Sequence, residues 1–219
     1  MFAKELISNG VSPLMTSDTG LEALSLMEEF KVKHLPIVNN ELLLGLISDD
    51  DIFTLNDPEA AIGNYSLSSQ NPYVFDSQHL YDVIKEIAVQ KLTLMPVVDK
   101  NMHYLGVVVL TDLIQQLAQM SAINQPGGVI VLEISEHDYS LGELAQIVES
   151  NDAKILSSYI YSVPNSTLLE LTLKINKVNI NGILQTLERY DYRIKTTIFA
   201  NEDEEMDERF DSLMKYLNI

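Results

Sequence analysis

Apolar and polar positions follow one pattern twice in the first half of the chain. The run HLPIV at residues 34–38 returns sixty residues later as LMPVV at 94–98. Before each run, apolar residues fall at i, i+1 and i+4, which is one face of a helix. After each run, LGLI at 44–47 matches LGVV at 105–108. The pattern predicts an internal repeat with units at about 1–60 and 61–120.

Each unit predicts the order strand, helix, strand, strand, helix. In the first unit we expect these elements at residues 14–16, 21–30, 35–38, 42–47 and 50–56. Asp18 or Thr19 can cap the first helix, and Asp57-Pro58 ends the last one because proline cannot continue a helix. Two such units can hide their sheet faces only against each other, so residues 1–120 are predicted to form one pseudo-symmetric module.

The second half follows a different pattern. Residues 121–127 are polar with a glycine at the end and predict a linker. After it we expect strands at 129–134, 155–161, 168–175 and 193–199, with helices at 141–150 and 179–190. This order predicts a ferredoxin-like βαββαβ domain over 128–200, with both helices on one face of an antiparallel sheet. The fold class is therefore α/β followed by α+β.

Residues 201–219 form an acidic tail with an apolar stripe. Phe210, Leu213, Met214 and Leu217 fall at i, i+3, i+4 and i+7, which is the spacing of one helix face. The tail therefore predicts a C-terminal helix that docks on its own protein or on a sister subunit.

Charge and composition exclude several function classes. The net charge is −18 and both halves are acidic, so attraction to nucleic acid or to anionic lipid is disfavoured. No apolar run is long enough to span a membrane and no signal peptide is visible, so a cytoplasmic location is expected. The absence of cysteine excludes disulfides and thiolate sites. The four histidines are scattered and no catalytic motif is present, which predicts a protein that is not an enzyme.

The repeated strands and the Gly-x-x-x-x-x-Asp endings of both units resemble a tandem CBS-domain pair over residues 1–120. The resemblance implies binding of an adenine nucleotide or another adenosyl ligand in the clefts between the repeats. Occupancy of these clefts would control a partner or an attached domain. AMP, ADP, ATP and S-adenosylmethionine are the candidate ligands.

The resemblance carries candidate binding residues to each cleft. It places a hydroxyl three residues after the glycine and an aspartate six after it, for a phosphate and for the ribose hydroxyls. The first cleft has both residues, whereas the second keeps the aspartate but has Val109 at the hydroxyl position, with a threonine as a displaced substitute. The first strand of each unit would add backbone contacts, and a valine from each hLPhV strand would flank the adenine. The candidates are Thr16, Val38, Ser48 and Asp51 in the first cleft, and Val74, Val98, Thr111 and Asp112 in the second.

Three consecutive carboxylates open the last helix of the first unit. Asp49, Asp50 and Asp51 would repel a polyphosphate there, which favours a nucleoside, an adenosyl cation or a nucleotide bridged by magnesium. We interpret the three residues first as helix caps and only second as a metal site.

The start of the second domain resembles an ACT domain, because residues 138–147 read DYSLGELAQI. Such domains often bind amino acids before their first helix, where Gly142 would permit close approach, but a packing role for this glycine is the preferred interpretation. The order CBS–CBS–ACT resembles the acetoin utilisation protein B type. It predicts a homodimeric, ligand-sensing regulator with an unknown protein target. The alternatives are a constitutive scaffold with empty clefts and a divalent-cation sensor.

Overall fold

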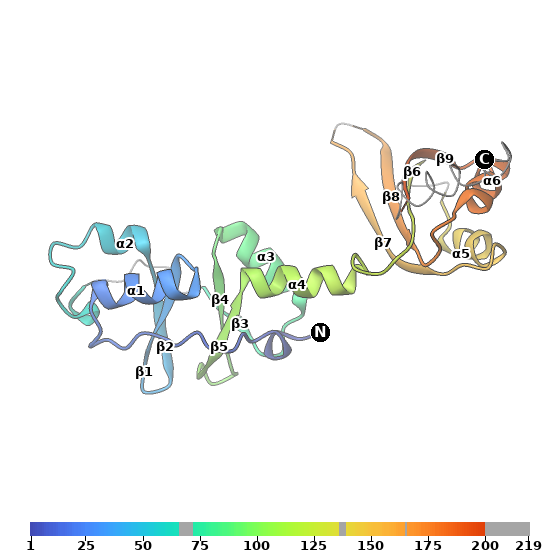
Figure 1. Cartoon of the computed structure of the whole chain (residues 1–219). Coiled ribbons are helices and arrows are strands. Elements are labelled where there is room, and N and C mark those ends of the chain that lie inside the picture. Colours follow the sequence, from blue (N-terminus) through green and yellow to red (C-terminus); the bar gives the residue numbers. More distant parts are fainter. Residues whose placement is uncertain (66–71, 136–138, 165, 200–219) are drawn as a thin grey trace, which may run out of the picture. The chain divides into compact units, whose positions relative to one another are not determined.

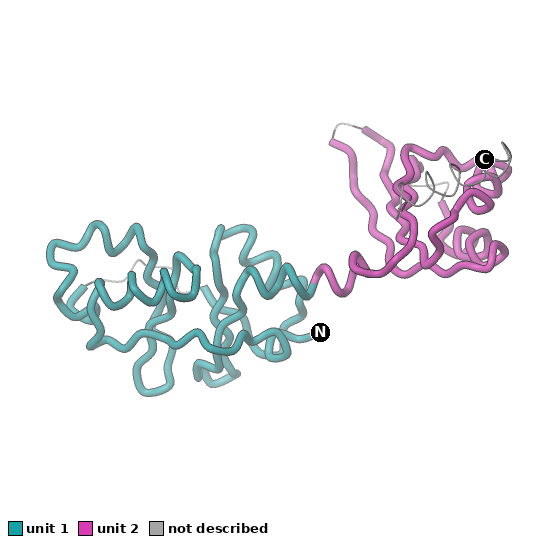
Figure 2. The backbone as a smooth tube through the Cα atoms, in the orientation of Figure 1, with its two compact units in different colours: residues 1–116 teal, residues 117–219 magenta. Residues whose placement is uncertain are grey.

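The computed structural model describes residues 1–65, 72–135, 139–164 and 166–199. It divides the chain into two compact units, Met1–Gln116 and Leu117–Ile219, which Figures 1 and 2 show. The predicted C-terminal helix lies outside the described residues. No helix in the described ranges is long and apolar enough to cross a membrane.

The first repeat contains the predicted helices and hairpin. Thr19 caps α1 by accepting a hydrogen bond from the Glu22 backbone nitrogen. The predicted strand at 14–16 is reduced to one parallel bridge between Leu14 and Ile37. The last helix ends at Phe53, earlier than predicted. The elements are a 3₁₀ turn η1 (Ala3–Glu5), α1 (Gly20–Phe30), β1 (His34–Asn39), β2 (Leu42–Ser48) and α2 (Asp49–Phe53).

The second repeat reproduces the first in backbone detail. Strand pairing has an irregularity at the same place in each hairpin, after Ile37 and after Val97. The first long helix of each repeat also ends at a lysine in the left-handed conformation, Lys31 (φ 56°) and Lys91 (φ 54°). The elements are η2 (Ile62–Asn64), β3 (Val74–Phe75), α3 (Leu80–Gln90), β4 (Leu94–Val98), β5 (Tyr104–Val109) and α4 (Leu110–Met120).

The two repeats exchange their opening turns. The backbone nitrogen of Ala3 donates to the carbonyl oxygen of Gln78 at 2.9 Å, so η1 lies against the second repeat. In the same way, Gly63 donates to Thr16 at 2.9 Å, so η2 lies against the first. Because each opening turn bonds to the other repeat, neither repeat is complete alone. Within the unit Met1–Gln116 the two repeats are thus joined by contacts that the sequence did not predict.

The second unit has the predicted ferredoxin-like topology. Its strand order is β7-β8-β6-β9, and each neighbouring pair is antiparallel. Buried residues of β6 and β8 pack against Leu144 and Ile147 of α5 and against Ile183 and Leu187 of α6, which places both helices on one face. The elements are β6 (Val129–Ser135), α5 (Leu141–Glu149), β7 (Ile155–Ser162), β8 (Leu168–Ile175), α6 (Asn181–Arg189) and β9 (Arg193–Ile198).

The end of the predicted linker is part of the second unit. Gly127 has φ 138°, and a Cβ atom on it would lie 1.9 Å from the carbonyl oxygen of Ile175. Gly128 donates to Lys177 and accepts from Ile175, both at 2.9 Å. The glycine at 127 is therefore required by a close backbone approach.

We expect Gly127→Ala to lower the free energy of unfolding of the second unit by about 2 kcal/mol or more, because of strain and overlap with Ile175. Gly142→Ala is the matched control. Gly142 lies in the first turn of α5, where a Cβ would meet only Ser140 Oγ at 3.7 Å. Alanine there should stabilise by about 0.5–1 kcal/mol. Urea unfolding of both variants tests this, and equal effects would contradict it.

Candidate ligand clefts

In the first cleft, Ser48 and Asp51 bond to each other. Ser48 is the N-cap of α2, and its Oγ accepts from the Asp51 backbone nitrogen at 3.0 Å. One Asp51 carboxylate oxygen accepts from the Ser48 nitrogen at 2.9 Å and from its hydroxyl at 2.7 Å. This reciprocal capping box satisfies orphan donors at the helix start. A ligand that used both side chains here would have to compete with these bonds.

The acidic run beside this cap does not converge on a point. Asp49 accepts from the Asp50 backbone nitrogen at 2.9 Å and lies 3.7 Å from the Lys33 ammonium. Asp50 is exposed, and Asp51 is committed to the cap. Within the described ranges, no three acidic or histidine side chains are grouped so as to hold a metal ion. The geometry therefore favours the capping interpretation of Asp49, Asp50 and Asp51 over the metal site.

His34 joins this cleft to the second repeat. Its Nδ1 lies 2.9 Å from Thr93 Oγ1, which also accepts from the Lys33 backbone nitrogen at 2.9 Å. Burial lowers the pKa of His34, although Asp49 and Asp51 act in the opposite direction. His34 is therefore held neutral at the junction of the two repeats, next to the acidic helix start.

In the second repeat, a residue from far away in the chain takes the bond that the Asp51 carboxylate makes in the first, which is to the amide just before the helix. Val109 occupies the position of Ser48, and its backbone nitrogen donates to Ser8 Oγ at 3.1 Å. Ser8 is held there because its own nitrogen donates to Val107 at 2.8 Å. Gly106 permits this approach, since it has φ 151° and a Cβ on it would lie 2.5 Å from Ile7. The sequence analysis missed Ser8, which no local pattern connects to residue 109.

The other candidates of the second cleft differ in how they are presented. Asp112 is half-buried, and within the described parts of the chain its carboxylate has no hydrogen bond or ion pair. Thr111 is exposed on the same turn. Val74 and Val98 are fully buried and lie on neighbouring strands, so their side chains belong to the core and can offer a ligand only backbone atoms.

In the first cleft, Val38 and Thr16 are half-buried. The backbone of Val38 donates to Leu14 at 2.8 Å, and the carbonyl of Thr16 accepts from Gly63. The Val38 side chain is thus presented differently from its buried equivalent Val98, and the backbone oxygen of Thr16 is already used by η2.

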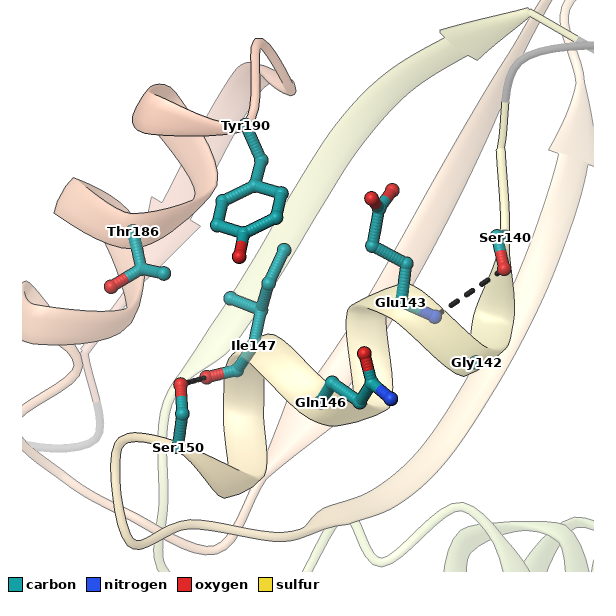
Figure 3. Close-up of a pocket in the computed structure, with 8 residues that line it drawn as sticks. All are labelled: Ser140, Gly142, Glu143, Gln146, Ile147, Ser150, Thr186 and Tyr190. Carbon is teal, nitrogen blue, oxygen red and sulfur yellow. Dashed lines mark hydrogen bonds between the residues drawn. The ribbon is translucent and has the colours of Figure 1, made fainter.

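A groove of about 470 Å³ lies between α5 and α6 of the second unit, as Figure 3 shows. Gly142 is on its wall with room around it, which contradicts the packing role expected for this glycine. Glu143 accepts a 2.6 Å hydrogen bond from the Tyr192 hydroxyl. Burial of Tyr192, together with this bond, raises the pKa of the tyrosine to about 12. Among the described residues, its wall contains no lysine or arginine. The lining residues are Ser140, Gly142, Glu143, Gln146, Ile147, Ser150, Thr186 and Tyr190.

Each repeat carries a long helix, a β-hairpin and a closing helix, and the two repeats interlock through their opening turns, which defines a paired-repeat module. The CBS domain family model matches residues 3–56 and 62–119, more than half of the chain. The chain therefore belongs to the CBS domain family.

Known proteins similar to this chain include CBS domain-containing protein YhcV of Bacillus subtilis. It is 28% identical over 143 residues, which cover 62% of this chain and 96% of that protein. A CBS domain pair/ACT domain protein from Thermotoga maritima is 20% identical with a TM-score of 0.49, over 54% of this chain and 98% of that one. A Vibrio cholerae protein assigned to acetoin utilization is 20% identical with a TM-score of 0.49, over 57% and 95%.

We expect Ser8→Ala to lower the free energy of unfolding by about 1 kcal/mol, because the Val109 amide loses its acceptor at the start of α4. Ser8→Thr keeps the hydroxyl and should stay close to wild type. Ser17→Ala, at an exposed position of the same module, is the control. Thermal and urea unfolding measure the effect, and an alanine variant as stable as the threonine variant would contradict the capping role.

The lowered pKa of His34 predicts a pH dependence of stability. The histidine is neutral in the fold and titrates near pH 6.5 when unfolded, so unfolding takes up a proton as the pH falls through that value. The contribution of neutral His34 is complete above that range and is lost as the pH falls toward the lower folded pKa. His34→Asn cannot titrate and should lose less stability between about pH 7.5 and about pH 5.5. Urea unfolding at both pH values measures this. An equal loss of the free energy of unfolding in the wild type and in His34→Asn would contradict the prediction.

Proposed function

We propose that this protein is a non-catalytic sensor that binds an adenosyl ligand in its CBS pair. The proposal is based on the different hydrogen bonding of the two aspartates at equivalent positions, Asp51 and Asp112. Asp51 accepts two hydrogen bonds from Ser48, whereas the half-buried Asp112 carboxylate has no such bond within the described residues. A carboxylate in that state can accept both hydroxyls of a ribose without first giving up a cap. The second cleft is therefore proposed as the primary site.

Charge at the two helix starts supports different ligands for the two clefts. One carboxylate, Asp112, opens α4, so the helix dipole there can attract a phosphate, with amide nitrogens facing it. Three carboxylates open α2 and oppose a polyphosphate. We assign AMP, ADP or ATP to the second cleft. The first cleft suits a nucleoside or S-adenosylmethionine, or a nucleotide whose charge is reduced by magnesium.

Regulation requires that the ligand bind two states of the protein with different affinity. The exchanged opening turns provide a route, because η1 and Ser8 contact the second cleft from the first repeat. We propose that ligand binding changes the arrangement of the subunits or acts on the second unit. We retain the second unit as an ACT-like output domain. Among the described residues, the wall of the groove between α5 and α6 offers no cation for an amino acid carboxylate, so we assign it no amino acid ligand. A cytoplasmic location belongs to the same proposal.

Binding calorimetry with AMP, ADP, ATP and S-adenosylmethionine, with and without magnesium, tests the proposal. Asp112→Asn should weaken nucleotide binding about tenfold to a hundredfold, because hydrogen bonds to a charged group are lost. Asp51→Asn should weaken it less.

Glu28→Gln removes the same charge from an exposed site on α1 and is the control for general electrostatics. Binding lost only in Asp51→Asn would move the site to the first cleft. No heat with any ligand at millimolar concentration would overturn the sensor and favour the constitutive scaffold.

A further inference from the structure

The dipeptide Asn-Gly occurs twice in the chain, at residues 9–10 and 181–182. Asparagine is a thermolabile residue, and a glycine after it leaves its own backbone nitrogen unshielded because it has no side chain. Both pairs are exposed, so exposure does not distinguish them. The difference between the two pairs lies in how firmly each backbone is held.

The reaction open to such a pair is intramolecular. The glycine backbone nitrogen attacks the side-chain carbonyl carbon of the asparagine, a new C–N bond closes a succinimide ring, and the side-chain amide leaves as ammonia, which takes up the proton of the glycine nitrogen. Water then opens the ring at either carbonyl and gives aspartate or isoaspartate. The sum is one water consumed and one ammonia released. Because the reacting atoms belong to adjacent residues, the rate depends on how readily the backbone brings them together.

The first pair lies in a segment without secondary structure. Within the described ranges, neither Asn9 nor Gly10 forms a hydrogen bond. Gly10 has φ 99°, and beyond its chain neighbours no atom lies within 4 Å of the place where a Cβ would be. The segment is anchored only on either side: the Ser8 nitrogen donates to Val107 of the second repeat at 2.8 Å, and the Leu14 nitrogen donates to the first repeat at 2.8 Å. Residues 9–13 thus form a link between the repeats, and the backbone of this link can rotate at the Asn-Gly pair.

The second pair is held inside a helix. Asn181 and Gly182 open α6, and the Asn181 backbone nitrogen donates to Asn179 Oδ1 at 3.2 Å. The Gly182 carbonyl accepts from Thr186 Oγ1 at 2.9 Å, and a Cβ on Gly182 would lie 2.8 Å from Asn151 Oδ1. Ring closure requires the bond between Cα and the carbonyl carbon of the asparagine to turn away from its helical angle. The start of α6 must therefore open before this pair can react.

We propose that Asn9 is a site of spontaneous deamidation, and that its isoaspartate product loosens the link between the two repeats. Isoaspartate carries the main chain through the side-chain carboxyl, which adds a CH₂ group to the backbone between the anchors at Ser8 and Leu14. Ser8 accepts from the Val109 amide at the start of α4 at 3.1 Å, so a displaced Ser8 leaves that amide without its acceptor. This chemistry does not depend on the proposed ligand.

Mass spectrometry of the full chain, incubated in mildly alkaline buffer and then digested with trypsin, compares the two pairs. The peptide of residues 5–31 reports on Asn9, and fragment ions of the peptide 178–189 report on Asn181. In the folded chain we expect Asn9 to deamidate at least about tenfold faster, because α6 must open locally first. In urea the two rates should converge. Equal rates in the folded chain, or a difference that persists in urea, would overturn the assignment.

Urea unfolding of the aged protein measures the effect on the link. Aged wild type that contains isoaspartate at residue 9 should unfold at a lower urea midpoint than fresh protein, with a shift that approaches that of Ser8→Ala. Asn9→Gln closes the ring far more slowly and should keep its midpoint when it is aged in parallel. Asn9→Asp adds the charge without the extra backbone group and should match Asn9→Gln. An unchanged midpoint in aged wild type would overturn the loosened link, and so would an equal shift in Asn9→Asp, because charge alone would then suffice.

Discussion

The exchange of opening turns between the two repeats is the contact on which the first unit depends. Ala3 bonds to Gln78 and Gly63 bonds to Thr16, so each repeat supplies backbone donors that the other must accept. These two hydrogen bonds tie the repeats to each other, and each repeat is stabilised by a turn that belongs to the other. The starts of α2 and α4 also lie where the repeats meet, with His34 beside Thr93 near α2 and Ser8 bonded to Val109 at α4.

The two clefts have diverged within one symmetric frame, and helix capping explains how. At α2 the cap is local: Ser48 and Asp51 satisfy each other, with two more carboxylates beside them. At α4 the cap comes from Ser8, and Asp112 is thereby relieved of that role. The difference between the two helix starts therefore lies in Ser8, which accepts from the Val109 amide where Asp51 accepts from Ser48 in the first repeat. Symmetry of the backbone does not imply symmetry of binding.

Periodic patterns predicted most of the fold, and non-periodic contacts account for what they missed. The hairpins and long helices of the repeats and the βαββαβ order follow from alternation and from helical spacing, which are local properties. The turns η1 and η2 are three residues long and leave no periodic signal. The contact of Ser8 with Val109 spans about a hundred residues, and Gly142 was assigned to packing because sequence does not show the space around it. Ser48 and Asp51 bond to each other and their role toward a ligand stays a prediction, whereas the burial of Val74 and Val98 depends on tertiary packing that the sequence does not show.

The exchanged turns also bear on how such a chain could arise. A protein made of one repeat would present both an opening turn with no acceptor and an acceptor with no turn. Two identical molecules would satisfy this requirement by swapping turns, at a cost that depends on their concentration. Gene duplication with a short connection makes the same swap intramolecular, at a high effective concentration. Once the copies are joined, each can mutate separately, which is the condition under which residue 109 could become valine while residue 48 remained serine.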